Sequence, residues 1–163
     1  MKSVLCLILF LFPFSLKGAA NNGENDYPFQ FSVTPIAGHE KLEFEILIKN
    51  EGDYPLSFEF PTSQYVEISV ANPSGHEVYR YSKGRFFLQA LQTIKIAPYQ
   101  TFSKVEKWNY QEDGQRVPEG QYTVTASLLS RKLNDHPIKN KQKTISKVKF
   151  NLPGEGTVTT KRS

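Results

Sequence analysis

Cysteine is almost absent from this sequence. The 163 residues include one cysteine, Cys6, which lies inside an apolar run near the N-terminus. If that run is removed as a signal peptide, the remaining chain has no cysteine, which excludes disulfides, thiolate catalysis and cysteine-ligated zinc. The hydrophobic core alone must then hold the fold. About 140 residues suffice for this, because a domain near that size buries roughly two-thirds of its unfolded surface.

Long apolar runs are also scarce, and the single example is VLCLILFLFPF, Val4 to Phe14. It follows Lys2 and precedes SLKGAA, in which Gly18 and Ala20 fit the small-x-small pattern for cleavage after Ala20. A membrane span needs about 20 apolar residues, so this run is too short for one. We therefore expect residues 1–20 to be a cleavable signal peptide, with an uncleaved anchor as the alternative. This predicts a secreted or periplasmic protein with no stable membrane span.

The motifs of common enzymes and metal centres are missing. The sequence contains no Gly-x-Ser-x-Gly elbow, phosphate loop or nucleotide fingerprint. The three histidines, His39, His76 and His136, lack the spacing of metal ligands. The turn NEGD, residues 50–53, offers too few oxygens for calcium. We therefore expect no catalytic residues, no metal and no cofactor, and we predict that the protein is not an enzyme.

Charge is distributed unevenly along the chain. Residues 21–130 hold nine Lys/Arg against fourteen Asp/Glu, a net charge of −5, whereas residues 131–163 hold nine against two, a net charge of +7. A basic end could contact nucleic acid or an anionic surface. Lysines that keep an edge strand and a tail in solution explain the same pattern. We favour the second explanation and expect no nucleic-acid partner.

No segment has the pattern of a three-turn amphipathic helix, and apolar residues instead recur at every second position. Strands are predicted within 29–33, 41–49, 56–60, 65–71, 76–82, 92–96, 101–108, 121–129 and 144–152. Seven to nine short strands separated by turn signals predict an all-β, immunoglobulin-like antiparallel β-sandwich over residues 29–152. A small closed barrel is the alternative. Residues 21–28 are expected to be a flexible lead-in and residues 153–163 a disordered basic tail.

Two stretches do not fit this pattern well. In FFLQALQTIKI, Phe86 to Ile96, the first six residues are compatible with a helical turn, whereas QTIKI alternates like a strand. In TFSKVEKW the apolar residues Phe102, Val105 and Trp108 are three apart. A β-bulge or a bend would explain that spacing.

The stretch WNYQEDGQRVPEGQYTV, Trp108 to Val124, is typical of a hairpin or sheet crossing. Trp108 ends a strand and can cover the core, while Gly114 supplies a tight turn after Asp113. Pro118 stiffens the loop and Gly120 lets the chain turn into the next strand. Tyr122 is expected to bury its ring and to donate its hydroxyl to a loop carbonyl.

Three segments, in this order, resemble the BsuPI domain family, the family of the Bacillus intracellular proteinase inhibitor. They are LEFEILIKNEGDYPLSFEFPTSQYVEISV, EVYRYSKGRFFLQALQTIKIAP and WNYQEDGQRVPEGQYTVTASL, and together they cover roughly residues 40–130. Tyr79 and Tyr81 stand where that family often has tryptophan, and Tyr99 where it often has glycine. The basic segment after Leu129 is extra. The resemblance implies an immunoglobulin-like sandwich and a proteinase inhibitor.

An inhibitor of this kind needs a rigid loop that enters a protease cleft. The candidate partner-binding loops are Gln111 to Glu119, with an exposed Arg116 followed by Val117, and Ser82 to Arg85, with Lys83 and Arg85 beside Gly84. Ordinary solvated arginines would also explain both loops, and this is the favoured explanation. The expected partner is a protein, and the resemblance implies a serine protease. The alternative is an extracytoplasmic interaction module without inhibitory activity, and an enzyme of unknown class is the least favoured hypothesis.

Overall fold

The computed structural model describes residues 27–154. The expected signal peptide, most of the lead-in and residues 155–163 of the tail lie outside this range. The described residues form thirteen β-strands and one short 3₁₀ helix, η1 (Lys141–Thr144). Nine of these strands have four or more residues and the other four have two. The longer strands agree with the seven to nine predicted from sequence, and the fold is an immunoglobulin-like antiparallel β-sandwich.

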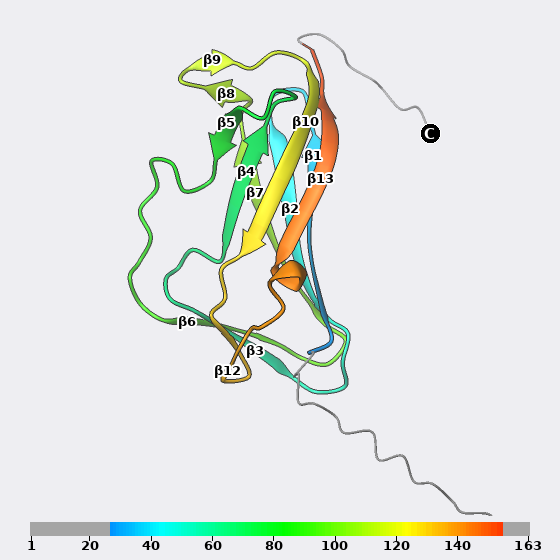
Figure 1. Cartoon of the computed structure of the whole chain (residues 1–163), viewed down its shortest axis with the longest axis vertical. Coiled ribbons are helices and arrows are strands. Elements are labelled where there is room, and N and C mark those ends of the chain that lie inside the picture. Colours follow the sequence, from blue (N-terminus) through cyan, green and yellow to red (C-terminus); the bar gives the residue numbers. More distant parts are fainter. Residues whose placement is uncertain (1–26, 155–163) are drawn as a thin grey trace, which may run out of the picture.

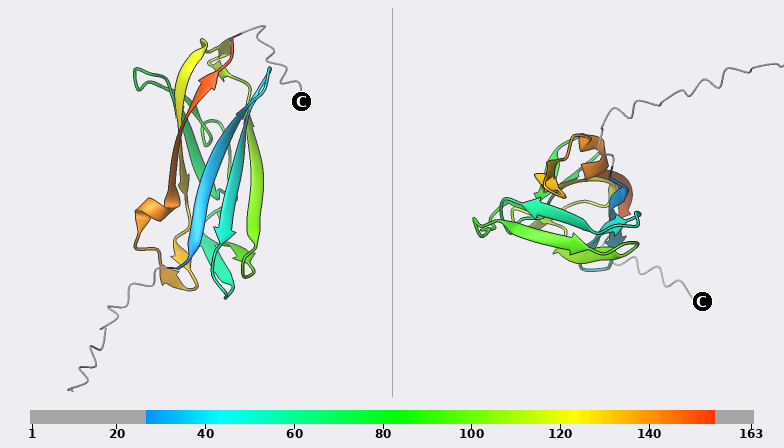
Figure 2. Two further views of the ribbon diagram at one scale, coloured as in Figure 1. Left: turned by 90° about the vertical axis from the view of Figure 1, so that its right-hand side faces the viewer. Right: turned by 90° about the horizontal axis from the view of Figure 1, so that it is seen from below.

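Two sheets form the sandwich (Figure 1). One has the strand order β1 (Phe29–Ala37), β2 (Leu42–Asn50), β7 (Thr101–Trp108). The facing sheet has the order β13 (Ile145–Leu152), β10 (Gly120–Leu128), β4 (Val66–Ala71), β5 (Glu77–Arg80). A third sheet, β12 (His136–Pro137), β11 (Lys132–Leu133), β3 (Leu56–Phe60) and β6 (Gln92–Ile96), lies at one end, and the hairpin of β8 (Gln111–Glu112) and β9 (Gln115–Arg116) lies at the other (Figures 1 and 2).

The core follows from the two-residue alternation. Leu42, Phe44, Ile46 and Ile48 of β2 are all buried, and the residues between them are not. Strands β4 and β10 bury alternate residues in the same way. Burying one such apolar side chain contributes roughly 1.5–3 kcal/mol. The alternation therefore fixes which face of each strand meets the opposite sheet.

Asn50 holds the crossing from the sandwich to the end sheet. Its side chain is fully buried, and Nδ2 donates to the carbonyls of Tyr54 (2.8 Å), Ile96 (3.2 Å) and Ala97 (3.0 Å). Its Oδ1 accepts from the amide of Gly52 at 2.9 Å. One side chain thereby joins the turn between β2 and β3 to the end of β6 through backbone groups of both segments.

The two long edges of the sandwich differ. On one side β1 lies against β13, where the Val33 amide donates to Ser146 Oγ at 3.1 Å. On the other side β5 is hydrogen-bonded only to β4, and β7 only to β2, among the described strands. The long β5–β6 connection, residues 81–91, contacts β7 here through Tyr81 and Arg85. Figure 1 shows this connection as the green loop that projects furthest from the sandwich.

Two sequence expectations need correction. Strand β7 has a continuous register with β2, so no β-bulge interrupts it. Val105 points outward, and the inward positions between Phe102 and Trp108 are taken by Lys104 and Glu106, which pair with each other. Residues 86–91 form no helical turn, whereas QTIKI forms β6 as the alternation predicted.

Candidate functional site

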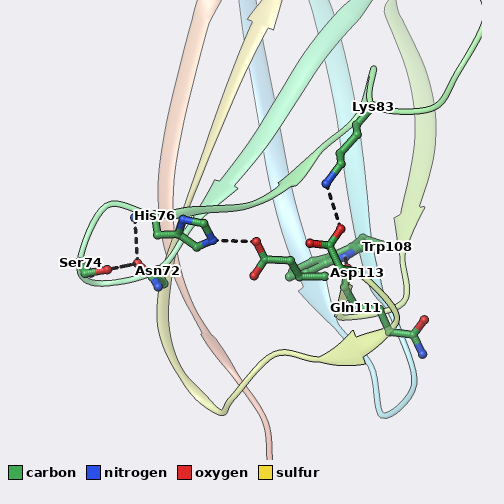
Figure 3. Close-up of polar contacts among 8 residues, drawn as sticks. Asn72, Ser74, His76, Lys83, Trp108, Gln111 and Asp113 are labelled. Atoms are coloured by element: carbon green, nitrogen blue, oxygen red, sulfur yellow. Dashed lines mark hydrogen bonds and ion pairs between the residues drawn. The ribbon is translucent and has the colours of Figure 1, made fainter.

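The structure brings the two candidate loops together at the end of the sandwich. Lys83 Nζ lies 3.2 Å from Asp113 Oδ1, which joins the β5–β6 connection to the β8–β9 hairpin (Figure 3). Both side chains are well exposed, so this ion pair contributes little energy. His76 Nε2, in the β4–β5 turn, lies 2.7 Å from Glu112 Oε1 and links a third loop to the same hairpin.

The β8–β9 hairpin is built as the sequence suggested. Asp113 (φ 48°) and Gly114 (φ 84°) both have left-handed backbones, as the tight hairpin turn requires. Trp108 is buried and its Nε1 donates to the Gln111 carbonyl at 2.9 Å (Figure 3). Tyr122 is buried and its hydroxyl donates to the Pro118 carbonyl at 2.8 Å. The chain enters β10 at Gly120, where φ is 147°.

Arg116 is not the exposed loop arginine that the sequence suggested. Its guanidinium lies 4.7 Å from the centre of the Tyr110 ring, and Nη2 donates to the carbonyls of Pro153 (3.3 Å) and His39 (3.5 Å). Val117 is buried, and its amide donates to the Tyr110 carbonyl at 2.8 Å. Both residues are therefore used by the hairpin itself, because the chain packs them against neighbours that are distant in sequence. Whether they also contact a partner stays a prediction.

The β5–β6 connection holds the other two candidates in different ways. Gly84 has a left-handed backbone (φ 74°), and the Arg85 amide donates to the Ser82 carbonyl at 3.2 Å. Lys83 extends toward the hairpin, whereas Arg85 lies back on the body of the sandwich. The Arg85 guanidinium is 4.2 Å from the centre of the Tyr81 ring, and Nη1 is 3.3 Å from Glu106 Oε2.

Glu106 is the centre of a charged cluster under this connection. Its side chain is only 12% exposed and accepts from Lys104 Nζ (2.8 Å) and the Tyr81 hydroxyl (3.0 Å), besides its contact with Arg85. Burial alone would raise the pKa of Glu106, but the hydrogen bonds from Lys104 and Tyr81 and the charges of Lys104 and Arg85 hold that pKa below its ordinary value. Burial also raises the pKa of the Tyr81 hydroxyl. Glu106 is thus a carboxylate at neutral pH and anchors the connection to β7.

Sequence reasoning missed the most exposed apolar residue of the described chain. Phe86, next to Arg85, is fully exposed, at 103% of its reference area, and Leu88 (64%) and Leu91 (67%) are exposed in the same connection. The signal was the run FFLQAL, in which five of the six residues are apolar and three of these are adjacent. Such a run cannot place all its apolar side chains on one buried face.

Phe86 stands between two anchors. On one side Arg85 is held by Glu106, as described above. On the other side Phe87 packs against Tyr81, with ring centres 5.8 Å apart. The Leu88 amide donates to Ser63 Oγ (2.9 Å), and the Ser63 amide donates to the Leu88 carbonyl (3.0 Å). The connection is therefore a projecting segment whose backbone is fixed while its apolar side chains face solvent.

Tyr79 lies behind the end of the site, in an aromatic stack. Its ring packs between Phe44 (5.7 Å) and Trp108 (5.3 Å). Its hydroxyl is buried and makes no hydrogen bond within the described residues, and burial raises its pKa to about 12. Tyr79 also lines a surface pocket of about 310 Å³, together with Lys83, Trp108 and Asp113. Tyr79 therefore lies beside residues of both candidate loops.

Two further observations concern only the described residues. No three or more His, Cys, Asp or Glu side chains between residues 27 and 154 lie close enough to hold a metal ion. Over the same range, no helix is both long enough and apolar enough to cross a membrane.

Comparison with known proteins gives one informative match. The model of the BsuPI family, described as intracellular proteinase inhibitor, matches residues 29–133, more than half of the 163-residue chain, and ends before β13. No curated protein matches the sequence.

Two solved structures illustrate the remaining likenesses. One is the CARDB domain of a Pyrococcus furiosus protein in complex with di-metal ions (14% identity, 78% of this chain and 90% of that chain, TM-score 0.41). The other is β-glucosidase 3B from Thermotoga neapolitana in complex with α-D-glucose (17% identity, 79% of this chain and 16% of that chain, TM-score 0.43). At these TM-scores neither likeness bears on what this chain binds.

Proposed function

Because the chain belongs to the BsuPI family of intracellular proteinase inhibitors, we propose that it is a proteinase inhibitor that acts outside the cytoplasm and contacts its protease with the β5–β6 connection. The protein then acts by binding and not by catalysis. The location rests on the N-terminal apolar run and its small-x-small end. The family's name describes inhibitors that act inside the cell. The proposed location is therefore inferred from the N-terminal residues of this chain and not from the family.

One observation carries the choice of loop. The β5–β6 connection combines exposed apolar side chains with a backbone that is held at both ends by Glu106 and Ser63. A segment fixed in its bound shape loses little conformational entropy when it enters a cleft, which favours tight binding. The β8–β9 hairpin is also held in place, but the large apolar side chains beside it, Trp108, Tyr110 and Val117, are buried.

A non-inhibitory interaction module remains the second candidate. Such a module would bind by adding a partner strand at a sheet edge or through an exposed loop. The basic strand β13 is poorly suited to strand addition, because its outer edge lies against β1. An exposed apolar loop would serve a binding module as well as an inhibitor, so the two candidates are separated by activity and not by geometry.

The test is a titration of serine proteases, including subtilisin-type enzymes, with the purified protein expressed from its full sequence. We expect one-to-one inhibition by the wild type and its loss when Phe86, Leu88 and Leu91 are all changed to serine. Arg116→Ala is the matched control and should still inhibit. Inhibition that survives the triple change would reject the β5–β6 connection as the contact. Mass spectrometry of the exported protein tests the cut after Ala20 in the same preparation.

A further inference from the structure

We infer that Phe86 is the side chain that enters the primary specificity pocket of the protease, and that this pocket is therefore deep and apolar. The inference rests on the proposed function, because it names the class of protease that the proposed inhibitor binds. Phe86 takes the role that the sequence suggested for Arg85 or Arg116, although the sequence alone did not identify Phe86.

The orientation of successive side chains is the first argument. Arg85 is turned back onto Tyr81 and Glu106, and Phe87 is turned back onto Tyr81. Phe86 between them is fully exposed. An extended segment that binds in a cleft presents alternate side chains to pockets, while its backbone pairs with the cleft wall. Phe86 holds the central outward position of such a segment.

The second argument is that the neighbouring cations already have a structural use. Arg85 cannot enter a pocket without leaving the Glu106 carboxylate. Glu106 would then keep Lys104 and Tyr81 but lose one of its three partners. Lys83 pairs with Asp113 of the hairpin, at the edge of the segment. A pocket with a carboxylate at its base, which selects Arg or Lys, therefore does not match what this loop presents.

The third argument concerns the gain from burial. When a phenyl side chain is enclosed, the apolar area removed from water is larger if the side chain was fully exposed before binding than if it was already partly buried. Leu88 and Leu91 extend the apolar surface in one direction along the chain. The partner is expected to have an apolar primary pocket and apolar neighbouring subsites, as in chymotrypsin-like specificity.

Substitutions of Phe86 test this directly, because a fully exposed side chain can be changed without disturbing the fold. Inhibition constants are measured for wild type, Phe86→Leu, Phe86→Gly and Phe86→Arg against one serine protease with an apolar primary pocket and one with a carboxylate at its base. For the first enzyme we expect Phe86→Leu to bind nearly as well as wild type. Phe86→Gly should bind on the order of 100-fold more weakly. Phe86→Arg should move the preference to the second enzyme.

Three results would overturn the inference. If wild type inhibits but all Phe86 variants keep both the affinity and the preference, another residue occupies the pocket. If wild type inhibits only the carboxylate-pocket enzyme, the class of protease is wrong. In both cases the proposed function stands. If wild type inhibits no protease while remaining folded, the proposed function fails and the inference fails with it.

Discussion

The β8–β9 hairpin and the β5–β6 connection touch through Lys83 and Asp113, yet they use their large side chains in opposite ways. In and beside the hairpin, Trp108, Tyr110 and Val117 are buried, and the Tyr110 hydroxyl donates to the Gly38 carbonyl at 2.8 Å. Even Arg116 lies on the Tyr110 ring. In the connection, large apolar side chains are left in solvent. The hairpin closes the core, whereas the connection presents a surface.

The difference lies in what anchors each segment. The hairpin is flanked by apolar side chains, Trp108, Tyr110 and Val117, which are buried and therefore committed to the fold. The connection is held by the partly buried carboxylate of Glu106 and by two hydrogen bonds between the Leu88 backbone and Ser63. These anchors leave Phe86, Leu88 and Leu91 available. A loop can be rigid and still offer apolar contact surface when polar groups do the anchoring.

The largest expected effect is a difference in the free energy of unfolding between a variant beside the hairpin and a variant in the connection. Trp108→Ala should lower the free energy of unfolding by about 3–5 kcal/mol, because it removes a buried ring from the core. Phe86→Ala should change it by less than about 0.5 kcal/mol, because the side chain is exposed. Urea unfolding of both variants measures the contrast. A large loss in Phe86→Ala would mean that this side chain supports the fold after all.

A smaller effect is expected at the polar anchor of the connection. Glu106→Gln keeps the shape of the side chain but removes the charge that accepts from Lys104, Tyr81 and Arg85, so we expect a loss of about 1–2 kcal/mol of stability. The connection should also be cut faster by a non-target protease, because one of its two anchors is weakened. Glu45→Gln on the solvent side of β2 is the matched control and should behave as wild type in urea unfolding and in limited proteolysis. Equal cleavage of both variants would show that Glu106 does not hold the loop.

Much of the fold was predictable because its strands alternate. The inward faces of β2, β4 and β10 follow directly from the spacing of their apolar residues. The turn at Asp113-Gly114 and the hydroxyl bond of Tyr122 depend only on neighbours within a few residues. Local chemistry of this kind can be read from sequence.

The rest of the site depends on contacts between distant segments. Lys104 and Glu106 face inward because they pair with each other and with the Tyr81 side chain, so a search for apolar spacing wrongly selected Val105. Arg116 is held by the carbonyls of residues far away in sequence. Neither arrangement produces a periodic pattern in the sequence. The sequence therefore located the two loops but did not show which of their residues are exposed.

The polar anchor should also depend on pH. The folded pKa of Glu106 lies below its ordinary value of 4.5, so the stabilisation from its ionised form is present above that value. It is lost as the pH falls through the lower, folded pKa. The difference in unfolding free energy between wild type and Glu106→Gln should therefore be constant at neutral pH and shrink below pH 4.5. A difference that stays constant down to the acid end would show that the ionised form of Glu106 is not what stabilises the fold.

The smallest expected effect concerns a single hydrogen bond beside the hairpin. Tyr122→Phe keeps the buried ring but removes the hydroxyl that donates to the Pro118 carbonyl. Its loss should cost about 1 kcal/mol, the usual net value of one hydrogen bond. Tyr99→Phe, at an exposed position, is the control and should leave urea unfolding unchanged. If Tyr122→Phe cost as much as Trp108→Ala, the hairpin would depend on this bond as the connection depends on Glu106, and the contrast between apolar and polar anchoring would disappear.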